Sequence, residues 1–164
     1  MRLALATVAS IAGLLLAAPA CAGEVPPPGT ARLVGTVLNS IDVDQQLAFY
    51  ETVFGLKVGM TLDHGTRREY MLRFSQDPSE AGLIIVHDSA SDPASKLAHG
   101  NAFERIVLRV NDMDALLTRL DAGGFAHQPV HAAAQGYRVL MLKDPEGYSL
   151  EVIQSRIAKQ DSRK

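Results

Sequence analysis

The chain has 164 residues, of which 47% are hydrophobic and 21% are charged, and its formal net charge is −2 at pH 7. This length accommodates one ordinary domain with a sizeable hydrophobic core. The near-neutral charge gives no sign of a polybasic surface, which argues against nucleic acid and anionic membranes as partners.

The first 22 residues differ in character from the rest of the chain. Arg2 precedes an apolar run from Leu3 to Leu16, and small residues follow as far as Ala22. This order is typical of a secretory signal peptide, and the apolar run is shorter than the ~20 residues that a membrane-spanning helix needs. We therefore expect residues 1–22 to be a signal peptide and the protein to be periplasmic or secreted.

Cys21 is the only cysteine, so the folded domain would use neither disulfides nor thiol chemistry. A lipoprotein signal would also place a cysteine there, but Ala18 and Pro19 fit its pattern poorly. Membrane attachment is therefore expected only if Cys21 carries a lipid. The flanking segments are expected to be a proline-rich linker at 23–31 and a polar tail at 156–164.

A weak internal repeat divides residues 32–155 into two halves. Segment 38–44 recurs as segment 108–114, and in both copies a strand runs into a helix start. Asp42 and Asp112 are placed to cap the free amide groups of the two amphipathic helices. Gly55 and the pair Gly123-Gly124 are expected to end these helices, since a left-handed residue is favoured there.

Three strand-like runs follow each helix, at 57–62, 68–74 and 83–87 in the first half and at 128–132, 138–142 and 150–154 in the second. Each half therefore predicts the order strand, helix, strand, strand, strand. We expect an α+β fold of two βαβββ modules, with a cleft between two small curved sheets.

The last strand carries a carboxylate among apolar residues. Asp144-Pro145-Glu146-Gly147 is typical of a type I turn, because proline fixes φ and the aspartate caps the turn. In the strand that follows, Leu150 and Val152 share one face and Glu151 and Ile153 share the other. An acid in apolar surroundings needs a metal, an arginine or several hydrogen-bond donors.

The order and spacing of these pieces resemble the vicinal oxygen chelate superfamily, the glyoxalase I, bleomycin-resistance and extradiol dioxygenase group. The likeness is greatest to bacterial glyoxalase I (lactoylglutathione lyase). It is carried by segments 32–38, 47–50, 53–57, 100–106 and 144–154. The resemblance implies a glyoxalase-type cleft between the two modules.

The resemblance also implies a divalent metal held by four inward side chains, at positions that are Gly35, Ile84, Arg105 and Glu151 in this chain. Of these only Glu151 is a metal-ligand type, because glycine and isoleucine have no donor and arginine stays cationic. We therefore expect a degenerate metal site with no cofactor, with nickel, zinc or manganese as the alternative. Arg105 is expected to pair with Glu151 in place of the metal, unless Arg105 turns to solvent and Glu151 pairs with Lys143.

Other side chains could contribute to the cleft. The five histidines form no close ligand pair, and His87 is the best candidate because a one-residue register shift would turn it inward. His99 and Glu104 lie on the segment that joins the halves and could reach the same cleft. An anionic or aromatic ligand could also meet Tyr70, Tyr137, Tyr148, Arg73, Arg109 and Arg138, although an exposed strand face explains them equally.

Two functions follow from the resemblance. In the first, the protein binds a small organic molecule without a metal, as bleomycin-resistance proteins do, through Arg105, Glu151 and His87. In the second, it is a metal-dependent lyase or isomerase of the glyoxalase I type, with Glu151 as metal ligand or catalytic base. A third reading is a dimerisation or partner-docking domain, and a homodimer is compatible with all three.

Overall fold

The structure is a computed structural model that describes Gly29, residues 31–77 and residues 80–155. One unit ends at Arg32 and a second begins at Leu33, and all described helices and strands belong to the second. No described helix is long and apolar enough to cross a membrane. The expected signal peptide at 1–22, most of the expected linker at 23–31 and the expected tail at 156–164 lie outside the described residues.

Two modules of the same element order follow one another along the chain. The first contains β1 (Gly35–Ser40), α1 (Val43–Phe54), β2 (Lys57–His64), β3 (Arg67–Arg73) and β4 (Gly82–Asp88). The second contains β5 (Ile106–Arg109), α2 (Met113–Ala122), β6 (His131–Ala132), a 3₁₀ turn (Ala134–Gly136), β7 (Arg138–Lys143) and β8 (Ser149–Gln154). The predicted duplication of a βαβββ unit is confirmed.

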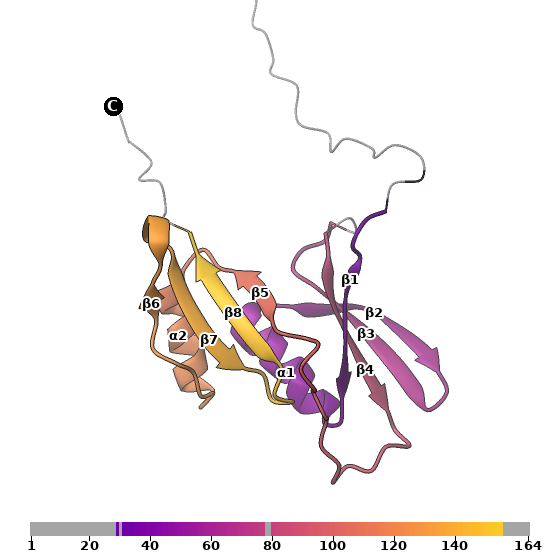
Figure 1. The fold of residues 1–164 in the computed structure, drawn as a ribbon. Coiled ribbons are helices and arrows are strands. Elements are labelled where there is room, and N and C mark those ends of the chain that lie inside the picture. Colours follow the sequence, from indigo (N-terminus) through magenta and orange to yellow (C-terminus); the bar gives the residue numbers. More distant parts are fainter. Residues whose placement is uncertain (1–28, 30, 78–79, 156–164) are drawn as a thin grey trace, which may run out of the picture. The chain divides into compact units, whose positions relative to one another are not determined.

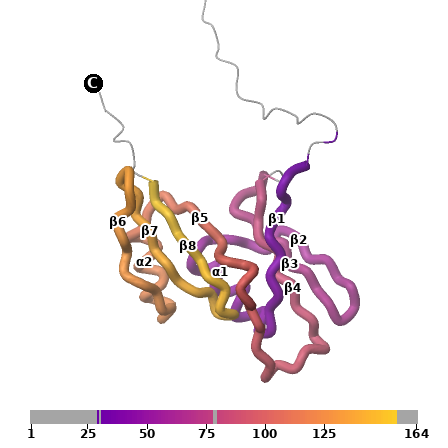
Figure 2. Tube along the Cα trace, in the orientation of Figure 1, coloured from indigo at the N-terminus to yellow at the C-terminus, as the bar shows by residue number. Residues whose placement is uncertain are grey.

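Each module forms one four-stranded mixed sheet (Figures 1 and 2). Sheet A has the order β1-β4-β3-β2, and sheet B has the corresponding order β5-β8-β7-β6. The first pair of each sheet, β1 with β4 and β5 with β8, is parallel, and the remaining pairs are antiparallel. The repeated hydrophobic pattern of the sequence thus produces the same strand order twice.

The two helices begin and end where the sequence predicts. Asp42 accepts a hydrogen bond from the backbone N–H of Gln45 at 3.0 Å, and Asp112 accepts two from the corresponding turn of α2. Gly55 ends α1 in the left-handed conformation, with φ of 73°. These contacts satisfy N–H groups that a helix start leaves without a partner.

Alternation along the strands separates a buried face from an exposed one. Leu38, Ile85 and Val152 point toward the helices and are buried in a single core that joins both modules. The opposite face of each sheet, here called the outer face, carries half-buried and exposed residues such as Val37 and Val107. Gly35, Ile84 and Glu151, three of the four positions that the resemblance implies for a metal site, lie on the outer faces, and Arg105 directly precedes β5.

Strand β6 is shorter than the sequence predicts. The expected strand at 128–132 is reduced to His131–Ala132. Pro129 has no N–H group to donate to a neighbouring strand, so regular pairing is interrupted at that residue. Gln128 still donates its backbone N–H to the Met141 carbonyl at 2.9 Å, which keeps the segment beside β7.

Candidate functional site

The four consensus positions are divided between the two modules. Val37 pairs with Ile84 across β1 and β4, so Gly35, two residues before Val37, lies on the same outer face of sheet A. Glu151 pairs with Val107 across β5 and β8, so Glu151 lies on the outer face of sheet B. Each module contributes two positions, as the internal repeat requires.

Arg105 and Glu151 form an ion pair in which the Arg105 Nε donates to the Glu151 carboxylate. A second guanidinium nitrogen, Nη1, donates to Glu104 at 3.0 Å. The hydrogen bond to Glu151 is the main reason that the pKa of Arg105 is raised above its ordinary value. The pairing expected from strand alternation is therefore present, with side-chain exposures of 39% for Arg105 and 20% for Glu151.

Sheet A offers no donor at its two consensus positions. A Cβ atom added to Gly35 would lie 2.8 Å from the carbonyl oxygen of Gly82 and 3.4 Å from Ile84. Ile84 has only hydrocarbon to present, and the adjoining cavity that it lines measures about 10 Å³. The first module therefore has neither the side chain nor the room for a metal ligand at position 35.

These donors do not match a divalent metal, which in proteins is held by several imidazoles, thiolates or carboxylates. The consensus positions offer one carboxylate, and a guanidinium already binds it. Within the part of the chain that the structure describes, no three His, Cys, Asp or Glu side chains are grouped to hold a metal ion.

The turn before β8 is anchored to α1 by Asp144. This buried carboxylate accepts hydrogen bonds from the Gln46 side chain at 2.6 Å, the Tyr50 hydroxyl at 2.8 Å and the backbone N–H of Tyr148 at 2.9 Å. Burial raises the pKa of the Asp144 carboxyl, although these three donors and the backbone N–H of Gly147 oppose that shift. Burial also raises the pKa of Tyr50, which remains a donor.

Glu146 binds the start of the same helix from the same turn. Its Oε1 atom accepts from the Ser40 hydroxyl at 2.7 Å and from the backbone N–H groups of Ile41 at 2.6 Å and Asp42 at 2.7 Å. A carboxylate at a helix start also interacts favourably with the helix dipole. Two of the three acids between positions 144 and 151 thus hold the modules together and fix where β8 begins, while Glu151 faces outward.

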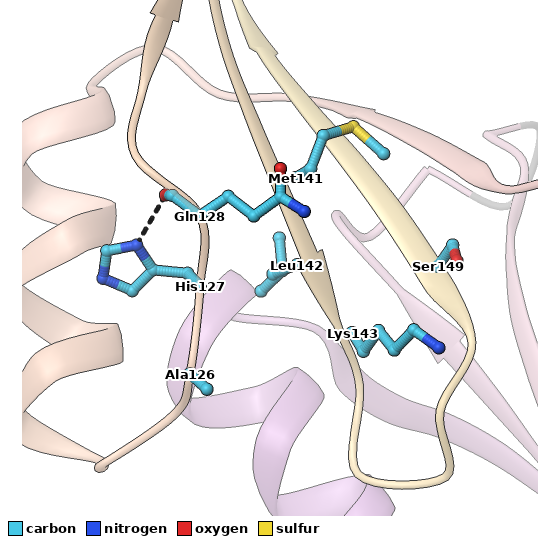
Figure 3. A pocket seen from close by; sticks show the side chains of 7 residues that line it. All are labelled: Ala126, His127, Gln128, Met141, Leu142, Lys143 and Ser149. Carbon is cyan, nitrogen blue, oxygen red and sulfur yellow. Dashed lines mark hydrogen bonds between the residues drawn. The ribbon is translucent and has the colours of Figure 1, made fainter.

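Two cavities that share lining residues lie on the second module, and neither is lined by Arg105 or Glu151. One measures about 390 Å³ and is shown in Figure 3; its walls are Ala126, His127, Gln128, Met141, Leu142, Lys143 and Ser149. The other measures about 360 Å³ and is lined by His99, Gly100, Asn101, Phe103, Glu104, Lys143, Gly147, Tyr148 and Ser149. The two share Lys143 and Ser149, which pair directly across β7 and β8.

Lys143 and Ser149 are site candidates that the sequence argument did not select. In Figure 3 the side chains of Gln128, Met141 and Lys143 extend toward β8, whereas His127 points toward α2. Lys143 directly follows the buried Leu142, and Ser149 directly precedes the buried Leu150. That alternation marks outward-facing positions, but it does not indicate which of them adjoin a cavity.

The histidines are divided between structural and cavity positions. His87 shares the face of Ile85, opposite to the face of Ile84, and its Nδ1 donates to the Ser40 carbonyl at 3.1 Å. The register shift that would turn it toward Glu151 does not occur, because Ile85 fills the core. His99 donates from Nε2 to the Glu146 carbonyl at 2.8 Å and packs edge-on against Tyr148, within the second cavity.

The fold and the site define the class of protein. Two βαβββ modules, each contributing two consensus positions, make a two-module α+β fold. The chain belongs to the Glyoxalase/Bleomycin resistance protein/Dioxygenase superfamily, whose sequence model matches residues 32–152.

The individual relatives share about a quarter of their residues or fewer with this chain. The chain is 26% identical to a probable lactoylglutathione lyase of Vibrio cholerae over 129 residues, which cover 77% of this chain and 93% of that protein. It is 26% identical to the lactoylglutathione lyase of Haemophilus influenzae over 133 residues, which cover 78% of this chain and 96% of that protein. The trypanothione-dependent glyoxalase I of Leishmania major has the same fold, with a TM-score of 0.65 at 20% identity over 76% of this chain and 87% of that one.

Proposed function

We propose that the protein binds a small organic molecule on the outer face of sheet B, without a metal at the consensus positions. The observation that supports this best is the Arg105–Glu151 pair, in which a guanidinium supplies the positive charge that the carboxylate needs. Among the described residues Arg105 donates from Nε and Nη1, which leaves Nη2 for a ligand.

The two adjoining cavities support a ligand with a polar and an apolar part. Met141 and Ala126 give the first cavity apolar walls, while Asn101 and Glu104 make the second one polar. Lys143 lies between them and makes no ion pair with the described residues, so its ammonium is free for an acidic or polar group. The second cavity is linked to the ion pair through Glu104, which lines it and accepts a hydrogen bond from Arg105.

Elemental analysis and ligand titration together test this function. Protein purified without a metal-binding tag should contain far less than one equivalent of nickel, zinc or manganese. Small aromatic acids should shift the amide NMR signals of Lys143, Ser149 and Glu151. Near-stoichiometric metal that Glu151→Gln abolishes would contradict the proposal.

A second candidate is a metal-dependent lyase or isomerase with Glu151 as ligand or base. The names of two relatives favour it, since the Haemophilus influenzae protein is named a lactoylglutathione lyase and the Vibrio cholerae protein a probable one. Formation of lactoylglutathione by the purified protein after loading with nickel or zinc, and loss of that activity in Glu151→Gln, would establish it.

We also propose export to the periplasm or the medium. The charged, apolar and small-residue segments of positions 1–22 support this, and attachment to a membrane would require a lipid on Cys21. The intact mass of the secreted protein tests both points, because cleavage near Ala22 and a lipidated Cys21 give different masses.

A homodimer is the assembly that we propose. The outer face of sheet A exposes Val37 at 55%, Met60 at 49% and Leu62 at 39%. Such an apolar sheet face is typical of an interaction surface. The sheet A faces of two copies can cover one another across a two-fold axis.

A further inference from the structure

The first module has a cavity of its own at the end of sheet A that follows α1. It measures about 450 Å³ and is lined by Gly55, Lys57, Val58, Gly59, Arg73, Phe74, Ser75 and Gln76. Two of these residues are cations and none is an acid. The cavity is on the other sheet from the Arg105–Glu151 pair, so what it binds is independent of the function proposed above.

The two cations are direct neighbours. Lys57 on β2 pairs with Arg73 on β3 in the antiparallel register. Like charges directly opposite one another destabilise a sheet. Within the described residues neither side chain makes a hydrogen bond or ion pair, and the nearby Glu80 instead accepts from the Ser75 hydroxyl at 2.6 Å.

The backbone makes room for Arg73. The register of β2 and β3 shifts between Val58 and Met60, which places Gly59 at a bulge. A Cβ atom on Gly59 would lie 2.9 Å from Cδ and 3.2 Å from Nε of Arg73. The Arg73 side chain therefore packs against Gly59, and a side chain at position 59 would displace it. Both residues line the cavity.

The second module lacks the corresponding pair of cations. Arg73 corresponds to Lys143, 70 residues later. Leu72 pairs with Val58, whereas Leu142 bridges to His127, so the position that matches Lys57 in the strand pairing is the uncharged Ala126.

We propose that Lys57 and Arg73 bind the oxyanion of a small organic ligand, a carboxylate or a phosphate, in this cavity. A bound oxyanion removes the repulsion between the two cations and accepts charge-assisted hydrogen bonds from both. Phe74, 43% exposed, and Val58, 45% exposed, supply an apolar wall for the remainder of the ligand.

The test uses three probes of similar size: phenyl phosphate, benzoate and the neutral benzyl alcohol. Both anions should shift the amide NMR signals of Gly59 and Ser75 of the purified protein saturably, and benzyl alcohol should not. Whichever anion has the lower dissociation constant shows whether the cavity prefers a phosphate or a carboxylate. Lys57→Met and Arg73→Met should each weaken the binding at least about tenfold, the effect of losing one charge-assisted hydrogen bond.

Two further variants separate binding from folding. Lys143→Met removes the repeat-related cation and should leave the signals of Gly59 and Ser75 and their probe affinity unchanged. Arg73→Glu can pair with Lys57, so it should remain folded, melt at or above the wild-type temperature and bind neither anion. The inference is overturned if the anions fail to saturate, if Arg73→Glu still binds them, or if Lys143→Met loses as much affinity as Arg73→Met.

Discussion

Arg105 and Glu151 neutralise each other on the outer face of sheet B, in a position that solvent still reaches. Side-chain exposures of 39% and 20% place the pair between a surface and a buried ion pair. A pair of this kind stabilises less than a fully buried one, because water screens the charge left behind.

Replacing Arg105 with alanine tests how much this partly exposed ion pair stabilises the fold. We expect the free energy of unfolding, measured with urea, to fall only slightly, because ion pairs that solvent reaches contribute little. Arg68→Ala is a matched control, since its pair with Asp63 has exposures of 54% and 55% and should contribute less. A loss in Arg105→Ala as large as that in Asp144→Ala would instead indicate a fully desolvated pair.

Restoring the family's histidines should have unequal effects at positions 35 and 105. Gly35→His forces a side chain against the Gly82 carbonyl and should destabilise the fold by about 1–3 kcal/mol, as overpacking does. Arg105→His adds an imidazole beside Glu151 in an accessible position and should bind zinc more tightly than the wild type. Urea unfolding measures the loss of stability, and calorimetric zinc titration measures the gain in affinity. A stable Gly35→His protein that gains zinc affinity would show that the backbone of sheet A can move to accommodate a side chain at position 35.

At the scale of elements, the turn between β7 and β8 joins the second module to α1 of the first. Asp144 accepts from Gln46 and Tyr50, while Glu146 accepts from the three groups that precede the helix. The turn therefore positions β8, and with it Glu151, relative to the first module.

Removing the Asp144 carboxylate should be costly. Asp144→Ala leaves three donors without an acceptor, and at about 1 kcal/mol each the free energy of unfolding should fall by about 3 kcal/mol. The control is Asp121→Ala, because the Asp121 side chain is 74% exposed and its loss should change stability by about 0.5 kcal/mol. Equal effects of the two variants in urea unfolding would contradict the anchoring role of the turn.

The same carboxyl should make stability depend on pH. Burial raises the pKa of Asp144 in the folded protein, so the unfolded chain releases this proton first, near its ordinary pKa of about 3.9. The folded state therefore loses stability as the pH rises from about 3.9 through the folded pKa. The stability of the wild type minus that of Asp144→Asn should decrease over this range.

Urea unfolding of both proteins between pH 3.5 and pH 8 measures the difference. The carboxyls of Asp63, Asp88 and Asp114 have lowered pKa values and act in the opposite direction. They are present in both proteins and cancel in the comparison. A difference that increases with pH would show that the hydrogen-bond donors outweigh burial at Asp144.

At the scale of the whole molecule, the exposed apolar face of sheet A predicts self-association. Light scattering after size exclusion should give the mass of a dimer, and Met60→Glu should raise the dissociation constant at least about tenfold by burying a charge in the interface. Thr61→Glu is the control, because Thr61 lies on the opposite face of β2. A monomeric wild type, or equal effects of the two variants, would contradict the proposed dimer.

The sequence by itself determined the features that depend on local pattern. Matched helix caps at Asp42 and Asp112, repeated after 70 residues, predicted the two modules. Alternation along β8 predicted that Glu151 lies on the opposite face from Leu150 and Val152, and the same reasoning paired it with Arg105. Such features follow from the geometry of one helix or one strand, which a few consecutive residues specify.

The tertiary structure alone decided which distant residues meet. The approach of Gly82 to Gly35, the contact of Asp144 with Gln46 and Tyr50, and the closeness of Lys57 to Arg73 join parts of the chain that the local pattern treats separately. His87 illustrates the same limit, because the packing of Ile85 into the core set the register that the strand sequence left open. Register and cavities depend on how sheets and helices fill space together, and no short segment contains that information.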